Sequence, residues 1–197
     1  MALTKVQAEG VNLADNFAFT GTVSGSGMNL LLSNTISSAV AQYDISSTYI
    51  NSTYDSYIIY ATLLPASDNV FLKSRVFVGG SIQTGTIYGA EAGDNASSNY
   101  MNNNADDSMK MQTDTVGNAT GEGGTWFISL HNVNNTDRPF AYFGDLHKYS
   151  TSGTSASSTI GGGLIVANRG SVVNGYRFFF NSGNIASGAV RVYGIRT

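Results

Sequence analysis

Side chains of two kinds alternate along residues 69–79, and this alternation constrains the fold more than any other feature of the sequence. One set is aliphatic or small: Val70, Leu72, Ser74, Val76 and Val78. The other set includes Lys73 and Arg75. Because successive side chains of a strand point to opposite faces, the charged set predicts a solvated face and the valine set a buried face. The segment is therefore expected to be a strand with one face in the core.

The composition favours strands over the whole chain. Gly, Ser, Thr and Asn together make up more than two fifths of the 197 residues. These four residue types rank low in helix propensity and are common in strands and turns. Hydrophobic residues account for 42% of the chain, which is too many for a disordered segment. The sequence therefore predicts one globular all-β domain.

Further segments with strand character follow at short intervals. They are residues 54–64, 125–133, 140–149, 159–168, 175–181 and 189–195. About eight or nine short strands separated by turn residues are typical of a β-sandwich of jelly-roll type. A barrel is the alternative architecture.

Two local features refine this expectation. Both faces of residues 54–64 are largely apolar, which predicts a central strand covered on both sides. Residues 65–69 combine Pro, Ser, Asp and Asn, and we expect them to form the turn of a hairpin that joins this strand to the next. The glycine run at 161–163 precedes an apolar strand and predicts a flexible turn or a bulge.

The chain divides into an arm and a domain. Residues 1–38 are interrupted by Gly21, Gly25 and Gly27, which predicts an extended arm with one or two short strands. Residues 39–197 are expected to form the β-sandwich. Residues 92–124 are rich in Asn, Asp, Gly and Ser and predict a long loop, which in a domain of this size is usually functional or mobile.

The charge pattern argues against two classes of partner. Thirteen acidic and ten basic residues give a net charge of −3 without a basic run, which disfavours nucleic-acid binding. A membrane helix needs a run of about 18 apolar residues, and no stretch of the sequence approaches this length. The first residues of the sequence lack the features of a secretory signal. We therefore expect no membrane insertion and synthesis in a cytoplasm. The chain has no cysteine, so disulfides and thiolate sites are excluded.

Three ordered blocks, which span about half of the chain, carry a family resemblance. The first is residues 15–25, with the motif FTGTVSG. The second comprises residues 54–57, 63–68 and 77–80, and the third comprises residues 180–188 and 192–195, which end in YGI. Together these blocks resemble structural proteins of marine tailed bacteriophages.

The resemblance implies a non-enzymatic virion protein, made in the host cytoplasm. Such proteins are fibres, tail knobs or capsid decorations and are commonly homotrimers. By the same resemblance, the lead-in block attaches the domain to other proteins of the capsid or tail. Phe17, Phe19 and Val23 are the candidate residues of this virion attachment arm. No cofactor is implied.

A carbohydrate-binding module of a tail fibre, which recognises the host surface, is the alternative function. Aromatic rings stack on sugars, while Asn and Asp bind sugar hydroxyls. Tyr100, Asn102, Asp106 and Asp107 in the long loop are the candidate contacts for a ligand or partner. Trp126 alternates with apolar residues, so we expect it to be buried structure.

A polysaccharide depolymerase is the third hypothesis. It would need two carboxylates at a fixed separation. Asp106 and Asp107 are adjacent in the predicted loop, so a solvated acidic loop is the favoured interpretation. His131 and His147 share no metal-binding motif with Asp145, and we expect surface histidines and no metal site.

Overall fold

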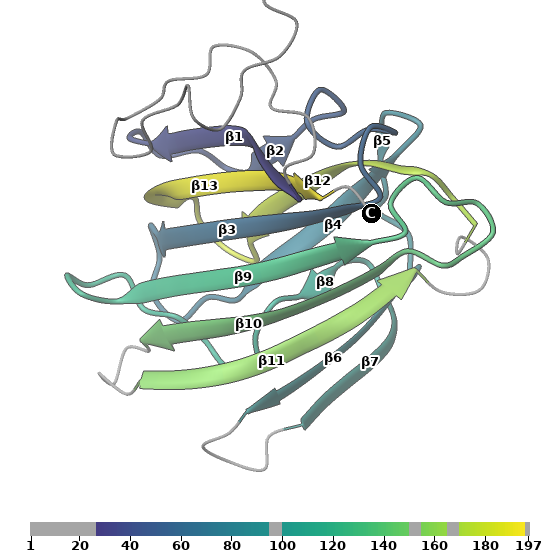
Figure 1. Cartoon of the computed structure of the whole chain (residues 1–197). Coiled ribbons are helices and arrows are strands. Elements are labelled where there is room, and N and C mark those ends of the chain that lie inside the picture. The colour runs from purple at the N-terminus through teal and green to yellow at the C-terminus, as the bar shows by residue number, and fades with distance from the viewer. Residues whose placement is uncertain (1–26, 95–99, 150–154, 165–169, 196–197) are drawn as a thin grey trace, which may run out of the picture.

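Two layers of antiparallel β-sheet pack face to face (Figure 1). The computed structural model describes residues 27–94, 100–149, 155–164 and 170–195. These residues contain no helix, and so none that could cross a membrane. The predicted all-β sandwich is confirmed, whereas its jelly-roll topology stays a prediction.

The larger sheet has eight strands. In spatial order they are β1 (Met28–Ile36), β13 (Ile185–Ile195), β3 (Ser56–Pro65), β9 (Gly123–His131), β10 (Ala141–Tyr149), β11 (Ser155–Leu164), β6 (Tyr88–Asp94) and β7 (Tyr100–Asp106). The smaller sheet contains β2 (Tyr43–Ile45), β12 (Val173–Phe180), β4 (Leu72–Val78) and β5 (Ser81–Ile82), and β8 (Met109–Lys110) pairs with β4. Figure 1 shows the larger sheet in front of the smaller one.

Strand β4 confirms the alternation of residues 69–79. Leu72, Ser74 and Val76 are fully buried, and the cations Lys73 and Arg75 lie on the outward face. The same alternation buries Trp126, whose indole N–H donates to the carbonyl of Met111 at 3.1 Å. The inner faces of the two sheets therefore supply the hydrophobic core between them.

Strand β3 is central, as predicted, because it lies between β13 and β9. The expectation that both of its faces are covered is wrong among the described residues, since Tyr60 is 42% exposed. The predicted hairpin is also wrong, because β3 and β4 belong to different sheets. The turn at 65–69 instead carries the chain from one layer to the other.

The predicted end of the arm at residue 38 does not mark a boundary in the fold. Residues 28–36 form β1, which pairs with β13 at the edge of the larger sheet. Phe17, Phe19 and Val23 lie outside the described residues. Their predicted role in virion attachment stays a prediction.

The single long loop expected at 92–124 is not found. This region contributes to the hairpin of β6 and β7, and it contains β8. Met109, Met111 and Val116 are fully buried, so much of the segment belongs to the core. The polar composition concealed these short strands because only a few apolar residues anchor them.

The glycines at 161–163 lie inside β11 and not in a turn. A Cβ at Gly163 would overlap the carbonyl oxygen of Phe140. The backbone of Phe140 approaches β11 so closely there that only glycine fits. The strand begins at Ser155, four residues before the predicted start.

One core tyrosine offers a test of the packing. The Tyr142 hydroxyl is buried and has no hydrogen-bond partner among the described residues, and burial raises the pKa of its phenol. We expect Tyr142→Phe to raise the free energy of unfolding by about 1 kcal/mol, because it removes an unsatisfied buried donor. Urea unfolding measures this change.

Tyr176 is the matched control, because its hydroxyl donates to Ser74 Oγ at 2.7 Å. Tyr176→Phe should therefore lower the free energy of unfolding by about 1–2 kcal/mol. An equal loss in both variants would contradict the difference between the two sites.

Candidate binding surface on the larger sheet

The outer face of the larger sheet carries side chains in rows that cross the strands, because outward residues on paired strands lie opposite one another. The first, which we call the apolar row, contains Leu30, Tyr193, Ile58, Ser129 and Phe143. Leu30 is 56% exposed and Phe143 is 57% exposed. This row is an uncharged and largely apolar strip.

A second row lies beside it along the strands. The aromatic row consists of Arg191, Tyr60, Phe127, Asp145 and Thr159. The rings of Tyr60 and Phe127 pack edge to face with their centroids 4.9 Å apart. The Thr159 hydroxyl donates to Asp145 Oδ1 at 3.0 Å. Rings and a carboxylate therefore stand side by side.

The third row carries shorter side chains. This hydroxyl row consists of Ala189, Thr62, Thr125, His147 and Ser157. The hydroxyls of Thr62 and Thr125 lie 3.3 Å apart and share a hydrogen bond. Because these side chains are shorter than the rings next to them, the surface is hollowed along this row.

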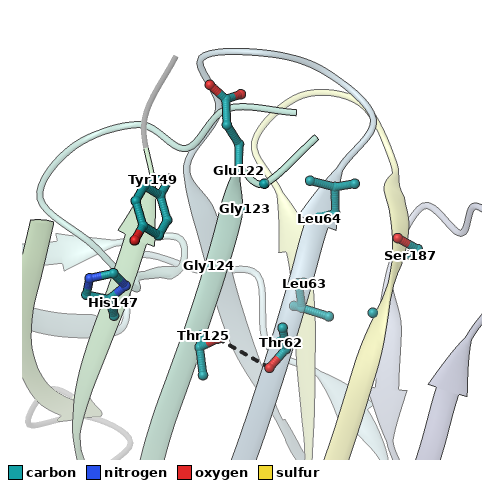
Figure 2. Close-up of a pocket in the computed structure, with 12 residues that line it drawn as sticks. Thr62, Leu63, Leu64, Glu122, Gly123, Gly124, Thr125, His147, Tyr149 and Ser187 are labelled. Atoms are coloured by element: carbon teal, nitrogen blue, oxygen red, sulfur yellow. Dashed lines mark hydrogen bonds between the residues drawn. The ribbon is translucent and has the colours of Figure 1, made fainter. Parts of the chain in front are cut away.

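Two hollows of about 410 and 300 Å³ meet at the hydroxyl row and share Thr125 and His147. The larger also borders the aromatic row, and the smaller reaches Leu64 and Tyr149. We call the combined depression the trough. Figure 2 shows its smaller part, with the His147 and Tyr149 side chains on β10 and the Thr62–Thr125 hydrogen bond between β3 and β9.

The candidate contact residues from the sequence lie elsewhere. Tyr100 and Asn102 belong to β7 at the edge of the larger sheet, and their side chains are outside what the structure describes. Asp106 ends β7, and Asp107 follows it in the turn to β8. Neither Asp106 nor Asp107 is among the described residues that line the trough.

Asp107 fixes the turn against the smaller sheet. Its carboxylate binds the Arg75 guanidinium at 2.6 Å and lies 3.6 Å from the Lys73 ammonium. The Ser108 hydroxyl donates to the carboxylate at 2.7 Å, and this bond with the two cations holds the pKa of Asp107 below its usual value. These contacts are those of an anchored turn.

The pKa of Asp114 is also lowered. Burial raises the pKa, but the backbone N–H of Thr115 and the Lys148 ammonium outweigh that effect. Lys148 points into the core with only 1% of its side chain exposed, and Asp114 lies 3.3 Å from its Nζ atom. This ion pair connects β10 to the segment after β8.

These two carboxylates predict loss of stability in acid. A carboxyl group with a lowered pKa in the folded state stabilises the protein above its ordinary pKa, which is 3.8 here. We expect the free energy of unfolding to fall as the pH decreases from about 4. Urea unfolding between pH 6 and pH 2.5 measures the slope.

Asp107→Asn should make that slope shallower, because the amide cannot titrate. An unchanged slope in this variant would contradict the assignment to Asp107.

Both histidines lie on the outward face, as predicted. The His131 and Phe143 rings pack edge to face with their centroids 5.8 Å apart, and the centroids of the His147 and Tyr149 rings lie 5.1 Å apart. No group of three or more potential metal ligands occurs among the described residues. The trough is not predicted from the sequence. Its rows depend on the spatial order of strands, for which the sequence has no direct signal.

No protein-family model, curated protein or solved structure matches this chain.

Proposed function

We propose that the chain is a non-enzymatic structural protein of a bacteriophage virion. It acts as a homotrimeric fibre, knob or capsid-decoration component that displays a jelly-roll β-sandwich outward. The three sequence blocks support the virion role. The observation that carries the assembly part of the proposal is the apolar row, in which Leu30 and Phe143 are each more than half exposed.

The apolar row suits contact with copies of the same chain. It contains no charged residue, so two copies can bury it without removing a charge from water. Each square ångström of apolar surface removed from water contributes about 25 cal/mol. Such a strip supplies part of the apolar surface that a stable interface between copies needs.

The environment of two carboxylates supports a role without catalysis. A glycosidase needs a carboxylic acid that is still protonated at working pH, which requires a raised pKa. Asp107 and Asp114 have lowered pKa values and are held by cations. Their contacts are those of structural ion pairs.

The oligomeric state tests this proposal. We expect light scattering at micromolar concentration to give three times the chain mass of 20.8 kDa. Phe143→Ser combined with Leu30→Ser should give monomers, because each exposed apolar side chain is replaced by a polar one.

Val172→Ser serves as the control. Val172 is 37% exposed and lies outside the apolar row, so this variant should remain trimeric. A stable monomer of the unaltered protein would contradict the trimer, and a trimer of the double variant would contradict the role of the row.

Recognition of a host glycan is the second candidate function. The trough favours it, because aromatic rings and hydroxyl groups line its two adjoining hollows on an exposed sheet face. Rings that stack on sugars and polar groups that bind their hydroxyls are the usual elements of such sites.

A further inference from the structure

The floor of the trough is able to form additional hydrogen bonds. Thr62 and Thr125 share one hydrogen bond, and each hydroxyl has one donor and two acceptor positions. Asp145 accepts one hydrogen bond from Thr159, which leaves further lone pairs on the carboxylate. The floor can therefore both donate to and accept from a ligand that carries many hydroxyl groups.

Aromatic side chains form the walls of the trough. Tyr60 lies on one side and Tyr149 on the other, and each is 42% exposed. Phe127 packs against Tyr60 and fixes its ring. Exposed rings beside a polar floor match a sugar chain, since a sugar ring has apolar C–H faces and polar hydroxyl edges.

We infer that the trough binds an extended neutral glycan that lies across the strands of the larger sheet. This inference rests on the second candidate function and adds the position of the site and the class of ligand. The hydroxyl row crosses β13, β3, β9, β10 and β11. With neighbouring strands about 4.8 Å apart, the row is about 19 Å long, which accommodates several linked sugars.

The charges of the trough favour a neutral chain over an acidic one. Asp145 borders the larger hollow and Glu122 borders the smaller one. Both carboxylates would repel sulfated, phosphorylated or uronic sugars. His147, between them, can hydrogen-bond a hydroxyl group through a ring nitrogen.

An extended peptide fits this surface poorly. Peptides that bind sheets pair their backbone with an edge strand. Strands β3, β9 and β10 are paired on both sides, so their backbone groups are already used in the sheet. The trough lies over these interior strands, and their paired backbone leaves no open strand edge for a peptide to join.

An array of neutral and acidic oligosaccharides, probed with the full-length protein, tests the inference. We expect binding to at least one neutral glycan, and calorimetry with that glycan then gives the affinity. Tyr60→Ala should weaken binding about tenfold, because a ring contact is lost. Thr125→Val keeps the shape of the side chain but removes its hydroxyl, and it should also weaken binding several-fold.

Ser129→Ala is the matched control, because Ser129 lies on the same strand and face as Thr125 but in the apolar row. It should bind with unchanged affinity. Circular dichroism establishes that each variant is folded, and Thr125→Val decides the matter if Tyr60→Ala does not fold.

Other results would overturn the inference in distinguishable ways. Binding of a neutral glycan that neither variant weakens would reject the site but keep glycan recognition. Binding to acidic glycans alone would reject the ligand class. If no glycan binds, both the inference and the second candidate function fail, while the trimeric virion role remains to be judged by the oligomeric state.

Discussion

Trp126→Ala is expected to remove about 4 kcal/mol from the free energy of unfolding. Trp126 is fully buried between the sheets, and the substitution leaves a large cavity and an unpaired Met111 carbonyl. Domains are usually stable by about 5–15 kcal/mol, so this single change removes a large part of the total. Thermal and urea unfolding measure the loss.

Trp126→Phe separates the two contributions. It keeps most of the buried ring but loses the hydrogen bond to Met111, so we expect a loss of about 2 kcal/mol. If Trp126→Ala unfolded at the same urea concentration as the unaltered protein, the two sheets could not enclose a common core at this residue.

Gly144→Ala is expected to destabilise the protein by about 3 kcal/mol, although it adds only one methyl group. Gly144 lies on the inward face of β10, and its Cβ would overlap the carbonyl oxygen of Phe127 on β9. A backbone atom in a paired strand cannot move aside as a flexible side chain can. The two central strands would have to separate locally.

Gly161→Ala provides the comparison, because Gly161 lies in the neighbouring strand β11. Its Cβ would meet a side-chain atom, Phe143 Cδ1, at 3.3 Å. That exposed ring can shift, so the free energy of unfolding should change by only about 0.5 kcal/mol. Equal effects of the two substitutions would mean that β9 and β10 are not paired in the register described.

The sequence was most informative where one residue in two is apolar. Alternation along 69–79 and 125–133 correctly identified the buried sides of β4 and β9, because the side-chain period of a strand is fixed by backbone geometry. Strand ends were less well predicted. The start of β11 was placed at Thr159 because the serines before it give no apolar signal.

The alternation of apolar and polar residues does not determine the order of the strands in each sheet. Nothing in residues 54–69 distinguishes a hairpin from a crossing between layers, since both need a short turn after an apolar strand. The trough was missed for the same reason. Thr62, Thr125 and His147 come from three separate parts of the chain, and only the pairing of β3, β9 and β10 places them in one row.

The apolar outer side of β3 was interpreted as a sign that both faces are covered. Within the described residues that face is open, and the proposed trimer offers a cover for part of it. The apolar outward residues of β3 and their exposure in a single chain are both explained if another copy of the chain covers them.

Gold-labelled antibody against the protein, imaged on purified phage particles, shows whether the chain is a component of the virion. We expect label at regular positions on the outside of intact particles, with the sandwich accessible to the antibody. Recovery of the protein solely in the particle-free fraction of the lysate would contradict it.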